Sequence, residues 1–253
     1  SVGSGSYTFS TEGMVASAIE GTGTGDSTGV VVNLGSTALT NVNVLNNGGE
    51  SLSGAMTSVS AGSAAYVFAA SSITNSTVTD TLLNIDNVTL AGNGKNYVVG
   101  SDSANVVTGG TGQDIIDVGK GDDTINVGAA ANVTTADLYT GGAGDDVIKV
   151  TADSDVTGAV FDDMTGIETI TAVANGNATI KITLTSTAAS TQAFTIDATG
   201  LTGGTAAMTF VASDAEVDGA LTIKGSAGAD TITTGDGAAT VTGGAGNDGI
   251  TLD

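Results

Sequence analysis

The sequence predicts an all-β fold, a parallel β-roll or β-helix (a solenoid) with additional β-rich coils. Three observations lead to this prediction. A nine-residue pattern recurs in register, and self-similarity at that period is typical of parallel β-helices. Short segments of alternating polarity fill the stretches around the repeats. The chain has 39 glycines and only 4% aromatic residues, which suits a thin interior of small aliphatic side chains.

The repeats lie in two blocks and one further copy. Glycine is favoured at places two and four, Asp or Asn at place six, and an aliphatic residue at place eight. The first block spans residues 91–126 (AGNGKNYVV, GSDSANVVT, GGTGQDIID, VGKGDDTIN) and the second spans 225–251 (GSAGADTIT, TGDGAATVT, GGAGNDGIT). A further copy, GGAGDDVIK, spans residues 141–149.

The order of residue types within a repeat predicts a turn followed by a short strand. Glycine adopts φ > 0 without steric cost, so the first six places suit a tight turn. The last three places form a strand, whose side chains alternate between its two sides. Place eight is expected to point inward and its neighbours outward. The inward set is Val98, Val107, Ile116, Ile125, Ile148, Ile232, Val241 and Ile250.

This pattern resembles the RTX (repeats-in-toxin) family of secreted bacterial proteins. The resemblance implies that two nonapeptides form one coil of a parallel β-roll, so place-six residues two repeats apart stack on the same face. It also implies a calcium-binding mode, in which place-six carboxylates and main-chain carbonyls of adjacent turns are the ligands. The expected stacked pairs are Asn96 with Asp114, Asn105 with Asp123, and Asp230 with Asp248.

Electrostatics gives a reason for a cation at such a stack. Stacked strands lie ~4.8 Å apart. Two carboxylates about 5 Å apart repel by roughly 3 kcal/mol at an effective dielectric constant near 20. Ca²⁺ accepts about 6–8 oxygens in flexible geometry and removes that repulsion. The alternative is a solenoid rich in Gly and Asp that uses Asp only to form turns.

The predicted Ca²⁺ ligands are the place-six side chains and the carbonyl groups of four turn residues. Sites shared by Asn96 or Asn105 are expected to be weaker, because Asn replaces Asp, and Ala239 leaves one face without a carboxylate. The full set is Asn96, Asn105, Gly109, Thr111, Asp114, Asp123, Asp137, Asp146, Asp230, Gly243, Ala245 and Asp248.

Residues 132–140 (NVTTADLYT) are a candidate degenerate repeat, with Asp137 at place six and Tyr139 at place eight. This repeat comes into register if residues 127–131 loop out. The pairs then expected are Asp137 with Asp114, and Asp146 with Asp123.

Four regions are expected along the chain: a β-rich N-terminal region (1–90), the first RTX block (91–149), a β-rich insert (150–224) and a second, truncated block (225–253).

A short helix is expected over residues 11–20. The insert is expected to be a wider solenoid or a small sandwich. The solenoid is favoured, because strands that lead straight into Gly225 need no change of topology. Strands are expected at 30–34, 42–45, 64–69, 78–83, 88–90, 167–173, 178–184, 193–197, 208–212 and 220–224.

Composition excludes several functions. The net charge is −22, with five Lys and no Arg, so binding to nucleic acid or directly to an anionic membrane is not expected. The absence of His and Cys excludes a Ser-His-Asp triad, a thiol nucleophile and His-ligated zinc. Adjacent Asp162 and Asp163 could serve a glycosidase, but adjacent Asp residues in a loop are more typical of solvated charge or calcium ligation. An enzyme is therefore not expected, and no apolar run is long enough to span a membrane.

The richness in Thr, Ser, Ala and Gly resembles RTX-bearing surface-layer (S-layer) proteins of Gram-negative bacteria. This resemblance implies a structural protein that is secreted by the type I route, binds Ca²⁺ and self-associates at the cell surface. A cell-surface polysaccharide is a further candidate partner. The alternatives are a calcium-stiffened segment of an RTX adhesin and a subunit of an extracellular filament. Because the chain stops just past a repeat, it is expected to be a fragment of a longer protein.

Overall fold

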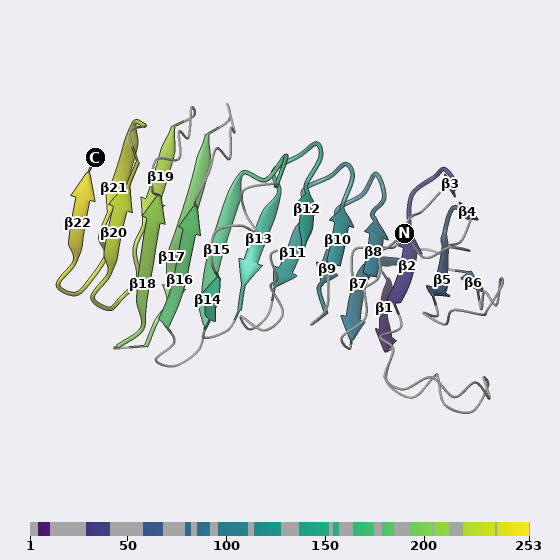
Figure 1. Cartoon of the computed structure of the whole chain (residues 1–253), viewed down its shortest axis with the longest axis horizontal. Coiled ribbons are helices and arrows are strands. Elements are labelled where there is room, and N and C mark those ends of the chain that lie inside the picture. The colour runs from purple at the N-terminus through teal and green to yellow at the C-terminus, as the bar shows by residue number, and fades with distance from the viewer. Residues whose placement is uncertain are drawn as a thin grey trace.

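The computed structural model describes residues 5–10, 29–40, 58–67, 79–81, 85–91, 96–110, 114–127, 137–151, 154–156, 164–174, 179–184, 193–203, 205–212, 220–235 and 237–252. These residues form strands, turns and bends, with no helix among them. Figure 1 shows the strands side by side along the long axis of the molecule, from the N-terminal strands at one end to the C-terminal strands at the other.

Three sheets build the two long sides of the solenoid. The first is wholly parallel and has nine strands, in the order β1 (Gly5–Ser10), β7 (Ile85–Ala91), β9 (Val106–Thr108), β11 (Thr124–Val127), β13 (Val147–Val150), β15 (Thr169–Ala174), β17 (Phe194–Leu201), β19 (Leu221–Lys224) and β21 (Ala239–Thr242). The second has six strands, in the order β12 (Leu138–Thr140), β10 (Asp114–Asp117), β8 (Asn96–Val99), β2 (Gly29–Asn33), β5 (Ser63–Val67) and β6 (Thr79–Thr81). The third is parallel and has five strands, in the order β14 (Ser154–Val156), β16 (Thr179–Leu184), β18 (Ala207–Ala212), β20 (Thr231–Thr234) and β22 (Gly249–Leu252).

The chain winds as a coil of two strands per turn. From β8 to β22, consecutive strands alternate between the nine-stranded sheet and the side opposite it. Each strand pairs in parallel with the strand two places later in the chain, except that β12 and β14 belong to different sheets, and β12 is followed by a single bridge from Thr140 to Thr165. In the first block Asn96 pairs with Asp114, and Val106 pairs with Thr124. The predicted all-β parallel solenoid, with two nonapeptides per coil, is confirmed.

The N-terminal end departs from this pattern. Strand β2 pairs in parallel with β8 on one side, but antiparallel with β5 on the other, and β6 is antiparallel to β5. A separate two-stranded sheet joins β3 (Leu39–Thr40) to β4 (Ser58–Val59). The helix expected over 11–20 and the strand expected over 42–45 lie outside the described residues.

The interior is a column of aliphatic side chains. Place eight is buried in both blocks at Val98, Val107, Ile116, Ile125, Ile148 and Ile232. Tyr139 fills the same place in the degenerate repeat and is fully buried. Val241 is half-buried and packs against this column, and Ile250 is in register with the buried Ile232 but is 45% exposed. Its strand β22 is the last of its sheet among the described residues, so no further coil packs on it.

The stretch between the two blocks continues the solenoid. Strands β15, β17 and β19 extend the nine-stranded sheet in parallel, which confirms the solenoid over the sandwich. Large apolar residues fill these wider coils, including Ile182, Leu184 and Phe210, all fully buried. No helix in the described part of the chain is long and apolar enough to cross a membrane.

Truncating an inward side chain is expected to destabilise the solenoid far more than truncating its outward neighbour. Ile116 is fully buried, whereas Ile115 on the same strand is only half-buried. Ile116→Ala should lower the free energy of unfolding by about 2–5 kcal/mol, because it leaves a cavity. Ile115→Ala should lower it by less than half as much. Urea unfolding in saturating calcium measures both losses. Equal losses would contradict the assignment of Ile116 to the inner side of the strand and Ile115 to the outer side.

Candidate metal centre

Three fully described turns share one backbone geometry. In the turns at 118–123, 141–146 and 243–248, the glycines at places two and four all have positive φ, between 98° and 145°. At Gly142, a Cβ would also collide with the carbonyl oxygen of Gly119 in the neighbouring coil. Glycine is therefore required there for two reasons, conformation and close stacking. The predicted role of these glycines is confirmed.

The place-six side chains point into the coil. Place six and place eight lie on the same side of the strand, because side chains alternate with a period of two. The place-six residues are at most 4% exposed at Asn96, Asn105, Asp114, Asp123, Asp137, Asp146 and Asp230. Register pairs confirm the predicted stacks, including that of the degenerate repeat on the first block.

The first stack, here called the long ladder, consists of Asn105, Asp123, Asp146 and Glu168 beside the nine-stranded sheet. In each step, a main-chain N–H donates to the carboxylate of the next coil. The donor–acceptor distances are 2.6 Å from Asn105 N to Asp123 Oδ1, 2.9 Å from Asp123 N to Asp146 Oδ1, and 2.7 Å from Asp146 N to Glu168 Oε2. The other oxygen, Oδ2, of both Asp123 and Asp146 is buried without a hydrogen-bond partner in the described structure.

The second stack, here called the short ladder, consists of Asn96, Asp114 and Asp137 on the opposite side. Asp114 accepts hydrogen bonds from Asn96 Nδ2 at 2.6 Å and from Gly110 N at 2.7 Å, one on each oxygen. Asp137 accepts from Asp114 N at 2.8 Å and from the Tyr139 hydroxyl at 3.3 Å. Both carboxylates of this ladder therefore have protein donors on both oxygens.

The second block pairs Asp230 with Asp248, and Asp230 N donates to Asp248 Oδ1 at 3.1 Å. The carboxylate of Asp230 accepts from Met208 N and Ser226 N, each at 2.6 Å, and the Ser226 hydroxyl lies 2.6 Å from Oδ1. Ser226 stands at place two, where the turns at 118–123, 141–146 and 243–248 have glycine. On the other face, Ala239 stacks on Leu221, so that face has no carboxylate, as predicted.

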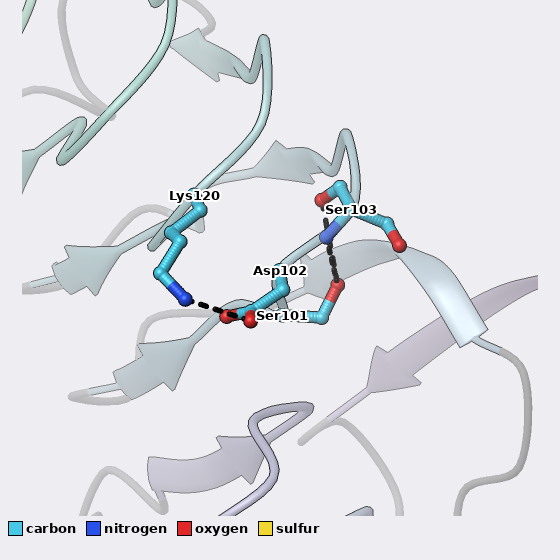
Figure 2. A network of polar contacts seen from close by, with 4 residues as sticks. All are labelled: Ser101, Asp102, Ser103 and Lys120. Atoms are coloured by element: carbon cyan, nitrogen blue, oxygen red, sulfur yellow. Dashed lines mark hydrogen bonds and ion pairs between the residues drawn. The ribbon is translucent and has the colours of Figure 1, made fainter.

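Serine at place two closes a second turn in the same way. Ser101 N donates to Asn105 Oδ1 at 2.7 Å, and Ser103 N donates to the Ser101 hydroxyl at 3.1 Å. Figure 2 shows this turn with the ion pair beside it, in which Lys120 Nζ lies 2.8 Å from Asp102 Oδ2. Both charged side chains are about 70% exposed, so the pair contributes little stability. The turn is held from inside, by Ser101 and Asn105.

The predicted carbonyl ligands are only partly described. Gly109 N donates to Asn126 O, and Ala245 N donates to Ser226 O, so both turns stack on a neighbouring coil. The carbonyl oxygen of Gly243 occupies the space that a Cβ on Gly225 would need. Thr111 and the pair Asp162 and Asp163 lie outside the described residues. As calcium ligands, all of these residues stay predictions.

The ladders hold carboxylates in an environment that disfavours their charge. Burial raises the pKa of Asp114 to about 7, and Asp137 adds to the rise, against the opposing hydrogen bond from Asn96. Burial raises the pKa of Asp123 to about 6, with a contribution from Asp146. Burial and then Glu168 raise the pKa of Asp146. Ionising these groups inside the coil is unfavourable unless a cation offsets the charge.

The long ladder fits a hard cation. Oδ2 of Asp123 and Oδ2 of Asp146 are buried acceptors without donors, and carboxylate oxygens are the ligands that Ca²⁺ prefers. Among the described residues, no three His, Cys, Asp or Glu side chains gather at one point, so main-chain carbonyls would have to supply the remaining ligands. Asp123 and Asp146 would hold the ion, and the ion would neutralise their charge.

Sequence reasoning missed two features of these sites. Glu168 continues the long ladder although it belongs to no nonapeptide, and only the pairing of Val147 with Thr169 reveals its place. The sequence shows serine in place of glycine at place two, at Ser101 and Ser226, but not its role. In the structure each serine hydroxyl donates a hydrogen bond to the place-six side chain of its own turn.

The family model of the RTX calcium-binding nonapeptide repeat matches the chain in four copies, at residues 90–125, 134–156 and 222–250. No curated protein and no solved structure matches the chain. The matched segments cover about a third of the sequence and contain the place-six residues of all three stacks. The chain thus contains RTX repeats, which are calcium-binding repeats of a β-roll.

In excess chelator, the free energy of unfolding is expected to fall as the pH rises from about 4 to about 7. Asp114 and Asp123 have folded-state pKa values of about 7 and about 6, above the ordinary value of 3.8. The folded chain therefore binds more protons than the unfolded chain in this window. Saturating calcium should reverse the sign, because the ion needs ionised carboxylates. Urea unfolding at several pH values measures how the free energy of unfolding changes with pH in chelator and in calcium. If it changes in the same direction in both, Asp114 and Asp123 are not the calcium-binding carboxylates.

Asp123→Ala is expected to remove bound calcium, whereas Asp117→Ala is not. Asp123 stands at place six with a buried, unpartnered oxygen, and Asp117 stands at place nine on the half-buried outer side of its strand. Calcium titration by calorimetry gives the number of ions per chain for each variant. Equal loss in the two variants would show that place six is not the ligand position.

Proposed function

We propose that this chain is a secreted structural protein that self-assembles at the cell surface, as an S-layer subunit or part of one. Calcium bound by the RTX repeats orders the coils and permits assembly. The observation that supports this most directly is the burial of stacked carboxylates in a chain of net charge −22.

Charge explains why calcium would control assembly. Copies of a chain with net charge −22 repel one another. Each Ca²⁺ bound inside a coil lowers that charge by two and relieves repulsion between carboxylates about 5 Å apart. The same ion fixes the stacking of adjacent turns. Calcium thus makes contact between copies less unfavourable and gives each copy one defined surface.

The outer face of the nine-stranded sheet supports a structural role. Four threonines on adjacent coils stand in one row, in register from strand to strand, and none of them is buried. They are Thr169, Thr195, Thr222 and Thr240. Such a row offers repeated, short polar side chains on a rigid surface, which suits regular side-by-side contact more than binding of one small molecule.

The remaining parts of the proposal follow from the chemistry of the chain. Without His and Cys, and with five Lys against 27 acidic residues, it is proposed to be neither an enzyme nor a nucleic-acid binder. Export through the type I route and attachment to a cell-surface polysaccharide are proposed, and direct insertion into the membrane is not.

A filament subunit is the second candidate. Its coils stack in parallel along one axis, as β15, β17 and β19 do, and coils of separate copies stacked in the same way would form a fibre. A calcium-stiffened segment of an adhesin would show neither kind of assembly.

Calcium is expected to trigger ordered assembly that reverses with chelator. Light scattering and negative-stain imaging would follow purified protein during a calcium titration. Two-dimensional sheets would support the S-layer proposal, and fibres would support the filament proposal. NaCl at matched ionic strength screens charge without bridging ligands, so it should not trigger assembly. Mg²⁺ should substitute poorly, because it demands octahedral geometry. Monomers that persist in calcium would favour the adhesin segment, and ordered assembly in NaCl alone would overturn the calcium switch.

A further inference from the structure

The long ladder does not end with the nonapeptides. The coil that follows Asp146 has a shorter turn, which contains Thr165 and Glu168. This turn stacks on the one before it, because Gly141 N donates to Thr165 O at 2.9 Å and Glu168 N donates to Asp146 O at 3.2 Å. Because Val147 pairs with Thr169, Glu168 stands beside Asp146 in the position that place six has elsewhere. The segment matched by the family model ends at residue 156, so Glu168 lies outside every matched repeat.

Gly166 takes the position of place one in this shorter turn. At Gly100 and at Gly225, the space that a Cβ would need is occupied by the place-one carbonyl of the next coil. At Gly141 the same space is occupied by the carbonyl oxygen of Gly166, which itself has φ of 64°. Only Ile167, 4% exposed, separates Gly166 from Glu168, where a nonapeptide has four residues. The turn is therefore a contracted form of the repeat.

Oxygen atoms converge between this turn and the one before it. Oδ2 of Asp146 is buried without a hydrogen-bond donor and lies 2.7 Å from the point where a Cβ on Gly141 would stand. The Gly166 carbonyl oxygen lies against the same point. Two oxygens bound to one Ca²⁺ at 2.3–2.6 Å can be up to about 5 Å apart, and these two are within that limit. The Glu168 carboxylate, held by Asp146 N at 2.7 Å, adds a second charge.

We propose that Asp146, Glu168 and the carbonyl of Gly166 form a calcium site that lies outside the nonapeptide repeats. The site joins the first RTX block to the wider coils that follow it. This inference rests on calcium binding by the repeats, since the ion would be the same. Its consequence is that calcium orders the junction at β13 and β15 as well as the repeats themselves.

The test is the number of calcium ions per chain in Glu168→Gln. Glutamine keeps the length of the side chain and can still accept from Asp146 N, but it removes the charge. Native mass spectrometry and calorimetric titration with calcium alone, on dilute monomeric chain, should show one ion fewer than in the unsubstituted chain. Circular dichroism in saturating calcium checks that the variant folds. The matched control is Asp197→Asn, which removes one charge from the outer ion pair with Lys224 and should leave the ion count unchanged.

The outcomes separate this site from the proposed function. One ion fewer in Glu168→Gln, with an unchanged count in Asp197→Asn, supports the site. The same ion count and affinity in Glu168→Gln as in the unsubstituted chain overturns it, while leaving calcium binding by the repeats intact. An equal loss in both variants also overturns it, since any removed charge would then suffice. No binding by the unsubstituted chain would overturn the calcium-dependent function and this site together. Ions are counted on monomers, so failure to assemble does not affect the result.

Discussion

The stacking of inward carboxylates at the corner of the coil is the constraint on which the rest of the structure depends. Parallel strands ~4.8 Å apart repeat every place-six side chain at the same position in the next coil. A period of nine, taken twice per coil, keeps place six and place eight facing inward in every turn. The aliphatic column at Val107 and Ile125 and the acidic ladder at Asp123 and Asp146 are therefore products of one register.

The chain meets this constraint in two chemically different ways. In the short ladder and at Asp230, hydrogen-bond donors from Asn96, Tyr139 and Ser226 satisfy the carboxylates from within the protein. In the long ladder, one oxygen of each Asp lacks a donor, and a divalent cation is the group that would complete it. Calcium dependence should therefore be uneven along the solenoid. It is expected to be strongest where both neighbouring turns have glycine at places two and four.

Much of this organisation could be predicted from the period alone. The stacked pairs within each block and the inward place-eight residues follow from counting residues, because repeat length fixes both the inward side and the register. The position of Asp137 over Asp114 required one further assumption, that residues 127–131 loop out. The contracted turn at Gly166 could not be predicted. It has one residue between place one and the acidic residue, where a nonapeptide has four, and the acidic residue is Glu168, whose side chain is one methylene group longer than that of Asp. The antiparallel pairing of β5 and β6 could not be predicted from the repeat period either, because these strands contain no nonapeptide and pair at the N-terminal end of the six-stranded sheet.

A solenoid distributes its stability over contacts between neighbouring coils, so a ligand that bridges two coils acts on one interface at a time. The long ladder crosses successive interfaces without a break, from Asn105 to Glu168. An ion at any step strengthens the two coils that it joins, and each of those coils is shared with the next step. We therefore expect calcium occupancy to set how far order extends along the axis. A regular outer face needs that extent, because its threonine row lies in register only when consecutive coils are stacked.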